Sequence, residues 1–343
     1  MQDLTRRGVV GGLTALGGGA PALAATALRP IPISSFVTVA EGLKLPEGVA
    51  ADRAGNIYVS NQASSCVIIK HDGTQRHVGP PGACNGVALD GKGGLLIASF
   101  GLLHNGPGPL LRLDLQTGAL EEVAGKIAGR TLVASNFPVV SQDGSVYCSH
   151  SKWADPGNIG DRLADGFVYR ASPGGVEVVA QGIRGANGCC FDRDEQHLYV
   201  AQTPAGNVLR MRRLGVGRFG PPEPYGPVLG GVTADAGIVE IRAQIAAGDR
   251  DLGYSDGLAF DIDGNLWVTL PFANKVVAIT PDRRLVTVVS DPEARLLDMP
   301  TNLAFGGPDL RDLYIVSRQR GNVIRARSPV AGLRLTGQDI AAP

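Results

Sequence analysis

Residues 256–269, DGLAFDIDGNLWVT, hold the pattern on which the fold depends. A polar residue comes first, followed by a short apolar stretch, a turn rich in Asp and Gly, and a second apolar stretch. Two apolar stretches joined in this way are typical of a β-hairpin whose turn needs a positive φ, which glycine adopts easily. The segment therefore predicts two antiparallel strands with Gly264 in the turn between them.

The same pattern occurs six times along the chain. The other five copies are EGVAADRAGNIYVS from Glu47, NGVALDGKGGLLIAS from Asn85, NFPVVSQDGSVYCS from Asn136, NGCCFDRDEQHLYVA from Asn187 and TNLAFGGPDLRDLYIV from Thr301. A third apolar stretch follows each hairpin, and most repeats have a fourth, so each unit contains four strands. Six such units predict an all-β fold, a six-bladed β-propeller with four-stranded antiparallel blades around a central channel. A solenoid built on the same repeat is the alternative.

The propeller is expected to form a single unit over residues 36–340. Residues 36–40, FVTVA, come too early for the first hairpin. They are expected to supply the outer strand of the last blade, which closes the ring and leaves no free sheet edge.

The composition excludes several other classes of protein. The chain has 343 residues, with 48 Gly and 23 Pro, and Lys plus Arg equal Asp plus Glu at 32 each. A nucleic-acid-binding protein would show a basic surplus, and a disordered chain would combine low hydrophobicity with high charge. Frequent Gly and Pro also argue against a long helical bundle.

Residues 1–25 are predicted to be an export signal rather than part of the fold. Arg6 and Arg7 precede a weakly apolar run from Val9 to Ala20, and an Ala-x-Ala site ends at Ala24. The run is shorter than the roughly 20 residues that a membrane-spanning helix needs. The arginine pair resembles the twin-arginine signal; an ordinary secretory signal and a disordered N-terminus are the alternatives. We expect no membrane span and export to the bacterial periplasm or secretion.

One position of the repeat carries a side-chain oxygen in all six copies. The residues before the first strands are Glu47, Asn85, Asn136, Asn187, Asp256 and Thr301. First strands line the central channel of a propeller, so these side chains should form a ring around one axis. A hard cation such as Ca²⁺ takes six to eight oxygen ligands, whereas zinc and copper sites favour His and Cys. The pattern predicts a calcium site; six unrelated turn residues are the alternative.

These motifs resemble the gluconolactonase/regucalcin (SMP-30/gluconolactonase/LRE-like) family. The resemblance rests on LPEG at Glu47, QDGSVYCS after Asn136, ANG at Asn187, SDGLAFDIDGNLWV at Asp256 and PTNLAFGGPDLRDLYI near the C-terminus, and it covers about residues 40–327. It implies a six-bladed propeller with one divalent metal, most commonly Ca²⁺ and sometimes Zn²⁺. It also implies that the metal ligands are Glu47, Asn136, Asn187 and Asp256.

The resemblance suggests a chemistry as well. A metal ion can polarise a lactone carbonyl and activate water, and the family points to Asp256 as the catalytic base. The chain departs from the family at two positions, where it has Phe137 in place of an aspartate and Ala134 in place of an arginine. It also departs in the loop after the third hairpin, where the family has an aspartate-led loop with a tyrosine and this chain has His150, Ser151, Lys152 and Trp153. These changes predict a less polar pocket.

Four residues are predicted to contact substrate: Asn85, His104, Phe137 and His150. Each His follows the second strand of a blade, which could place it at the rim, although a lone His more often packs or lies on the surface. The predicted function is that of a metal-dependent hydrolase that opens a small lactone substrate. The alternatives are another ester or phosphotriester substrate on the same metal, and a non-catalytic propeller that binds a ligand or protein and holds a structural Ca²⁺. The natural substrate and the oligomeric state stay open.

Overall fold

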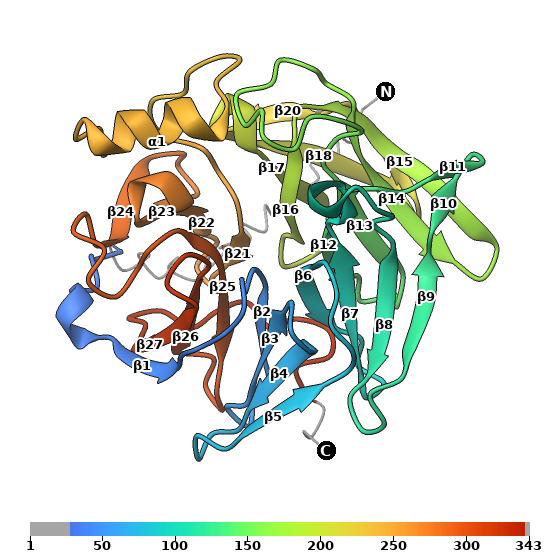
Figure 1. Cartoon of the computed structure of the whole chain (residues 1–343), viewed down its shortest axis with the longest axis horizontal. Coiled ribbons are helices and arrows are strands. Elements are labelled where there is room, and N and C mark those ends of the chain that lie inside the picture. Colours follow the sequence, from blue (N-terminus) through green and yellow to red (C-terminus); the bar gives the residue numbers. More distant parts are fainter. Residues whose placement is uncertain (1–27, 340–343) are drawn as a thin grey trace, which may run out of the picture.

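The computed structural model describes residues 28–339 of the chain. Six sheets are arranged radially around a common axis (Figure 1). Each sheet is antiparallel, and its strands follow one another from the axis outward. The prediction of an all-β six-bladed propeller is therefore confirmed. The predicted export signal, residues 1–25, lies outside the described residues.

The first three blades contain four strands each. Blade 1 consists of β2 (Val49–Ala51), β3 (Ile57–Asn61), β4 (Ser65–Ile69) and β5 (Gln75–Val78). Blade 2 consists of β6 (Cys84–Leu89), β7 (Gly94–Ser99), β8 (Leu110–Asp114) and β9 (Leu120–Ala124). A separate two-stranded hairpin, β10 (Lys126–Ile127) and β11 (Arg130–Thr131), comes before blade 3. Blade 3 consists of β12 (Ser135–Val140), β13 (Val146–His150), β14 (Gly166–Ser172) and β15 (Gly175–Ile183).

Two of the last three blades are irregular. Blade 4 has a divided outer edge, and blade 6 takes its outer strand from the beginning of the propeller. Blade 4 consists of β16 (Ala186–Phe191), β17 (His197–Gln202) and β18 (Asn207–Gly215), and its outer edge is divided between β19 (Arg218–Phe219) and β20 (Glu223–Tyr225). Blade 5 consists of β21 (Leu258–Phe260), β22 (Leu266–Leu270), β23 (Lys275–Ile279) and β24 (Leu285–Ser290). Blade 6 consists of β25 (Pro300–Gly306), β26 (Asp312–Ser317), β27 (Asn322–Arg327) and β1 (Val37–Ala40). The pairing of β1 with β27 confirms that an early strand closes the ring.

The hairpin turns between first and second strands use the chemistry expected from the sequence. Gly55, Gly144 and Gly264 have φ values of +86°, +80° and +83°. In blade 5 the Asp261 carboxylate accepts hydrogen bonds from the backbone and side chain of Asn265 and from the Trp267 indole, at 2.8–2.9 Å. A short side chain that satisfies the turn's own donors fixes the hairpin register.

The apolar core is divided into clusters between neighbouring blades. Six clusters of buried residues each join two adjacent sheets; one of them packs Trp267 and Val276 of blade 5 against Leu303 and Ile315 of blade 6. Both faces of most strands are therefore covered, which explains why many strands are apolar throughout rather than alternating. The axis itself is lined by the innermost strands.

Three of the four short 3₁₀ helices lie at one end of the channel, and the fourth lies at the outer edge of blade 6. Three follow second strands, namely η2 (Gly101–His104), η3 (Thr203–Ala205) and η4 (Pro271–Ala273), and η1 (Ile33–Ser35) precedes β1. The single α-helix among the described residues, α1 (Ile238–Ala246), lies in the long connection between blades 4 and 5. Its Ile241 packs against Leu252 and Tyr254. Within residues 28–339, no helix has both the length and the apolar character to cross a membrane.

Candidate metal centre at the mouth of the channel

The six predicted ring residues lie at the same end of the innermost strands. Asn85, Asn136, Asn187 and Thr301 are each the second residue of a first strand, and Glu47 and Asp256 stand two residues before theirs. Contacts run from blade to blade at this level. They are Asn85 Nδ2 to Asn136 O (3.2 Å), Ser149 Oγ to Asn187 O (2.7 Å), Gly188 N to Asp256 O (3.1 Å), Gly257 N to Thr301 O (2.9 Å) and Thr301 Oγ1 to Glu47 O (2.8 Å). The structure therefore brings the six residues together in a ring.

Glycines directly after four ring residues allow the innermost strands to approach closely. A Cβ atom on any of them would lie only 2.4–2.9 Å from backbone atoms of the next blade, which is closer than real Cβ contacts. The four are Gly48, Gly86, Gly188 and Gly257. The ring is therefore the level at which the blades are tightly joined.

Hydroxyl groups at the ends of second strands reinforce this junction. Thr269 Oγ1 accepts a hydrogen bond from Gly257 N (2.8 Å) and donates one to Thr301 O (2.9 Å). Ser149 Oγ likewise accepts from Phe137 N (3.0 Å) and donates to Asn187 O. Each hydroxyl joins its own blade to the next. We did not predict these residues from the sequence, although a Ser or Thr ends most of the repeated hairpins.

Two further hydroxyls determine the orientation of the ring amides. Asn136 Nδ2 donates to Ser151 Oγ (2.8 Å), and Ser151 Oγ donates its own proton to Ala186 O (2.8 Å). Asn187 Nδ2 donates to Thr203 Oγ1 (3.1 Å), which donates to Ser255 O (2.7 Å). Because each hydroxyl proton is already used, each hydroxyl can only accept from the amide. The two amide nitrogens are therefore held by these hydroxyls, and the amide oxygens are left for another partner.

The ring offers a set of oxygens that suits a hard cation. Asn136 Oδ1 is buried and has no hydrogen-bond partner among the described residues, and an unpaired buried acceptor is costly unless something binds it. Two carboxylates, Glu47 and Asp256, belong to the same ring. Residues 28–339 contain no group of three or more His, Cys, Asp or Glu side chains that could hold a metal. Carboxylate and amide oxygens are the ligands that Ca²⁺ prefers, so the residues present fit that ion.

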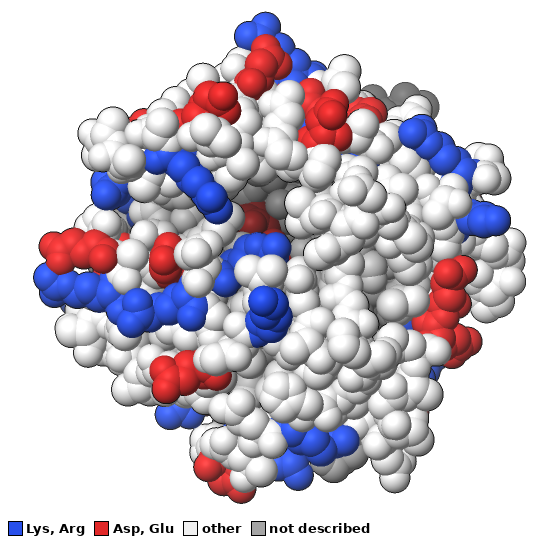
Figure 2. Space-filling view, viewed as in Figure 1, with Lys and Arg blue, Asp and Glu red and all other residues white. Residues whose placement is uncertain are grey.

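The two carboxylates and one arginine dominate the electrostatics of the ring. Burial and the negative charge of Glu47 raise the pKa of Asp256 well above its usual value, while the positive charge of Arg318 and the amide of Asn187 act in the opposite direction. Arg318 Nη1 lies 2.5 Å from Glu47 Oε2. Figure 2 shows acidic atoms at the bottom of the central hollow with basic atoms at its edge. A cation so close to the ring was missed in the sequence because Arg318 follows a second strand, outside the position that we compared.

A small cavity adjoins the ring on the side of blades 3 and 4. It is lined by Asn136 and Asn187 together with Phe100, Ser151, Lys152, Pro156, Asn158, Ile159, Gly185, Thr203 and Pro204. Lys152 is almost fully buried here, and its Nζ lies 2.6 Å from Asp161 Oδ2 and 3.2 Å from Asn158 O. The loop after β13 therefore forms one wall of the cavity, and the charge of its lysine is compensated by an aspartate of the same loop.

His150 is not brought to this cavity, contrary to our prediction that it contacts substrate. It is fully buried, stacked on Phe167 (4.6 Å between ring centroids) and packed against Trp153 (4.3 Å). Its Nε2 accepts a hydrogen bond from Ala134 N (3.2 Å). Burial lowers the pKa of His150 to about 3, so the imidazole is neutral at physiological pH. Its side chain belongs to the core beside blade 3 because the strand continues one residue further than the sequence indicated.

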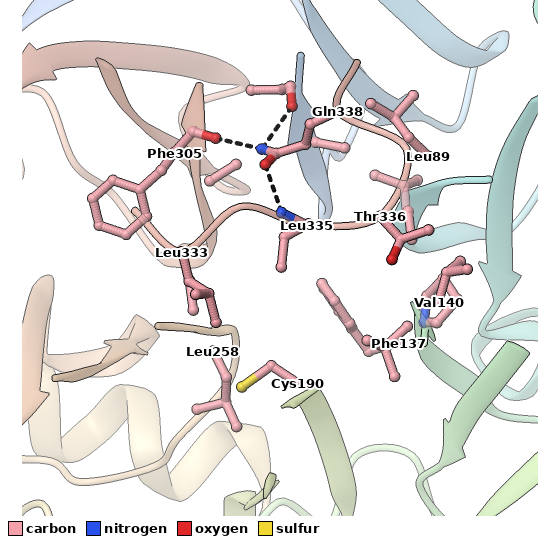
Figure 3. A pocket seen from close by; sticks show the side chains of 18 of the residues that line it. Leu89, Phe137, Val140, Cys190, Leu258, Phe305, Leu333, Leu335, Thr336 and Gln338 are labelled. Atoms are coloured by element: carbon pink, nitrogen blue, oxygen red, sulfur yellow. Dashed lines mark hydrogen bonds between the residues drawn. The ribbon is translucent and has the colours of Figure 1, made fainter. Parts of the chain in front are cut away.

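The other predicted substrate residues occupy three different places. Asn85 is buried in the ring, and its Nδ2 donates a hydrogen bond to Asn136 O. His104 is exposed at the end of η2, on the rim of the ring face. Phe137 lies in the channel beyond the ring, where an apolar cavity is lined by the inner strands and by Leu333, Leu335 and Thr336 (Figure 3). We had expected Phe137 to make the substrate pocket less polar. Because its side chain lies beyond the ring, it does not have this effect on the cavity at Asn136 and Asn187.

The C-terminal segment covers that apolar end of the channel. Gln338 Nε2 donates to Ala51 O (3.1 Å) and Phe305 O (2.8 Å), and Gln338 Oε1 accepts from Leu335 N (2.7 Å), as Figure 3 shows. The ring face is consequently the end of the channel at which polar groups are available to a ligand.

The chain is similar in sequence to a known protein family. The profile of the SMP-30/Gluconolactonase/LRE-like region matches residues 45–213 and 231–319. Pentonolactonase XacC of Haloferax volcanii is 25% identical over 183 residues, which are 53% of this chain and 52% of that protein. The chain thus spans about half the length of the curated relatives it matches.

Solved structures share the fold at lower identity. XC5397 of Xanthomonas campestris, described as a gluconolactonase, superposes with a TM-score of 0.65 at 22% identity, covering 86% of this chain and 89% of that one. The calcium-binding protein regucalcin of Agrobacterium tumefaciens gives a TM-score of 0.65 at 19% identity, covering 90% and 99%. Because the family profile covers most of the propeller, the chain belongs to the SMP-30/gluconolactonase/LRE-like family.

Proposed function

We propose that this protein is a metal-dependent lactonase, a hydrolase that opens a small cyclic ester. The observation that carries the proposal is the ring itself, in which two carboxylates and two amides lie together, neighbouring hydroxyls hold the amide nitrogens, and the buried Asn136 Oδ1 has no partner among the described residues. The names of relatives support it, since they include a pentonolactonase and a gluconolactonase.

Glu47, Asn136, Asn187 and Asp256 would hold the ion, with Ca²⁺ as the preferred occupant and Zn²⁺ as the less suited one. A relative described as a calcium-binding regucalcin supports that choice. When bound, a divalent cation polarises the lactone carbonyl and stabilises negative charge on its oxygen.

Asp256 is the proposed general base. Its carboxylate has two oxygens, so one can accept a proton from water while the other faces the ion. In the reaction, Asp256 takes a proton from water as the water oxygen bonds to the carbonyl carbon. The ring C–O bond then breaks, Asp256 returns its proton to the departing alkoxide to give a hydroxyl, and the carboxylic acid that forms releases its proton to solvent.

The rival hypothesis is a non-catalytic propeller that binds a ligand or a protein and keeps a structural Ca²⁺. Proton release in a pH-stat separates the two, using purified protein and a panel of sugar, aliphatic and aromatic lactones. Each lactone is tested after chelation and again with Ca²⁺ or Zn²⁺ restored. The proposal predicts hydrolysis that returns with the metal. Folded, metal-loaded protein that hydrolyses none of the panel would favour the binding propeller.

We also propose that the protein is exported through the signal in residues 1–25. Fractionation of cells that produce the full chain tests this directly. Arg6→Lys together with Arg7→Lys should retain the protein in the cytoplasm if the twin-arginine route is used. Unchanged export of that variant would point to an ordinary secretory signal.

A further inference from the structure

Arg318 is the one basic side chain among the described residues that forms an ion pair with a member of the ring. It directly follows β26 of blade 6, and its backbone N–H donates to Met299 O at 3.0 Å, which fixes the start of the side chain. Its side chain is 16% exposed and that of Glu47 is 14% exposed, so the pair is recessed but reachable from the channel mouth. A recessed ion pair is desolvated enough for its charges to matter.

Most of the hydrogen-bonding capacity of Arg318 is unused. An arginine has five N–H donors in a planar fork. In the described part of the chain, the guanidinium makes one hydrogen bond, from Nη1 to Glu47 Oε2 at 2.5 Å. Its Nε and Nη2 groups make no hydrogen bond within residues 28–339, and neither atom is fully enclosed. A planar fork with free donors matches the geometry of a carboxylate.

The charge balance at the ring changes sign when a divalent ion enters. When Glu47 and Asp256 are both ionised, they carry two negative charges and Arg318 carries one positive charge, so the ring is net negative before the ion binds. A bound divalent cation neutralises the two negative charges of Glu47 and Asp256, so the positive charge of Arg318 is no longer compensated. A fixed positive charge at the bottom of a recessed channel attracts anions, because low-dielectric walls concentrate the field.

The second cation of this region does not provide such a charge. Lys152 approaches from blade 3, on the opposite side of the axis, and lines the cavity beside Asn136 and Asn187. Its ammonium is bound to Asp161 Oδ2 (2.6 Å) and Asn158 O (3.2 Å), which belong to the same loop and are independent of the ring. Loading the ring with metal leaves that pair neutral. Arg318 is therefore the group whose charge becomes available.

We propose that Arg318 is a specificity-determining residue that selects lactones bearing a carboxylate substituent, so that the ring-opened product is a dicarboxylate. The inference rests on the proposed lactonase function and deepens it. In the loaded protein, Arg318 donates through Nε and Nη2 to the substituent carboxylate while the lactone carbonyl lies at the ring. A neutral lactone of the same ring size leaves these donors without a charged partner.

A matched pair of substrates and a matched pair of variants test this proposal. The substrates are glucaro-1,4-lactone, which has a carboxylate, and glucono-1,4-lactone, which has a hydroxymethyl group in its place. The variants are Arg318→Gln and, as control, Arg320→Gln in the same loop, where Arg320 is exposed and bonds to Ala294 O. A charge-assisted hydrogen bond contributes about 1.5–3 kcal/mol, which corresponds to roughly a tenfold or greater preference in kcat/KM.

We expect the wild-type protein and Arg320→Gln to prefer the carboxylated lactone by that factor, and Arg318→Gln to lose the preference, mainly through a higher KM for that lactone. A wild-type preference for the neutral lactone, or a preference that survives Arg318→Gln, would overturn the proposal. If Arg318 only served the carboxylate formed by ring opening, both lactones would be affected equally, and the ratio would not change.

Calcium binding gives a second readout that does not depend on turnover. Because the guanidinium repels a divalent ion at Glu47, Arg318→Gln should bind Ca²⁺ several-fold more tightly than the wild-type protein in calorimetry, while Arg320→Gln should not. Weaker Ca²⁺ binding would mean that Arg318 only holds Glu47 in place, which contradicts the proposal.

Failure of the proposed function is distinguishable from failure of this inference. If no lactone is hydrolysed, the calcium-loaded protein is titrated with glucarate and with gluconate, which differ by one carboxylate. Tighter binding of glucarate that is lost in Arg318→Gln would support the role of Arg318 in a binding protein. Equal binding of both anions would refute it.

Discussion

Two hydroxyl groups hold the amide groups of Asn136 and Asn187 in one orientation. The hydroxyls of Ser151 and Thr203 each donate their proton to a backbone carbonyl. Each hydroxyl can therefore only accept a hydrogen bond from the neighbouring amide nitrogen. The ring residues were recognisable in the sequence because they repeat in register. Their supporting hydroxyls were not, because they lie 15 and 16 residues away and only folding brings them near.

We predict that Ser151→Ala weakens Ca²⁺ binding by about 10-fold to 100-fold, as the loss of a residue supporting a metal ligand typically does. Without the hydroxyl, the Asn136 amide is free to rotate and present its nitrogen to the ion. Calorimetric titration of chelated protein measures the affinity. Ser172→Ala, in the distant β14–β15 hairpin, is the control. Equal affinities in the two variants would show that Ser151 does not orient Asn136.

His150 makes the stability of the fold depend on pH. Its pKa is about 3 in the folded protein and about 6.5 when unfolded, so the unfolded state binds the extra proton between these values. Its contribution is complete above about pH 6.5 and is lost as the pH falls from there toward 3.

Relative to His150→Gln, the wild-type protein should lose about 2 kcal/mol more unfolding free energy between pH 7 and pH 5. Urea unfolding at the two pH values provides the comparison. His104→Gln, at an exposed position, should follow the wild-type dependence. The same pH dependence in His150→Gln as in the wild type would mean that the imidazole is not held neutral in the fold.

At the scale of the strand, the repeated hairpins were the most predictable part of the structure. The turn glycines, the successive strands of each blade and the closing strand β1 all follow from local patterns in the sequence. The divided outer edge of blade 4 and helix α1 did not, because they lie in a segment that interrupts the repeat. Our prediction put Phe137 in the substrate pocket, which is the wrong part of the channel. The register irregularity between Ser135 and Pro138 interrupts the regular alternation of side chains along β12.

Close approach of innermost strands predicts a specific sensitivity to added volume. A Cβ atom at Gly257 would lie 2.7 Å from Thr301 O and 2.8 Å from Asn302 Cα, and neither backbone atom can move without shifting blade 6. Gly257→Ala should therefore cost about 1–3 kcal/mol, as overpacking of a dense core does. Urea unfolding gives the value. Gly157→Ala, whose Cβ would meet no atom within 4 Å, should be nearly neutral. Similar costs for both would contradict the tight junction.

At the scale of the whole molecule, the C-terminal segment joins blades that are far apart in the sequence. Gln338 binds Ala51 of blade 1 and Phe305 of blade 6, and it closes the apolar end of the channel. The repeat pattern ends before this segment, so the sequence offered no signal for the closure.

Gln338→Ala should lower the unfolding free energy by about 1–3 kcal/mol, because it leaves two buried carbonyls without their donor. The exposed Gln319→Ala is the control. Thermal and urea unfolding should both report the difference. A Gln338→Ala variant as stable as Gln319→Ala would show that the segment does not tie the ring closed.

The central claim is that one ring holds a divalent ion and uses Asp256 to open lactones. The direct test measures Ca²⁺ stoichiometry and calcium-restored lactone hydrolysis on the same samples of wild type, Asp256→Asn, Glu47→Gln and the exposed control Asp263→Asn. We predict one ion per chain with hydrolysis in the wild type and the control. In both ring variants we predict weakened binding and at least about 100-fold lower kcat/KM, with the propeller still folded. Full activity in a folded Asp256→Asn or Glu47→Gln variant would contradict the account.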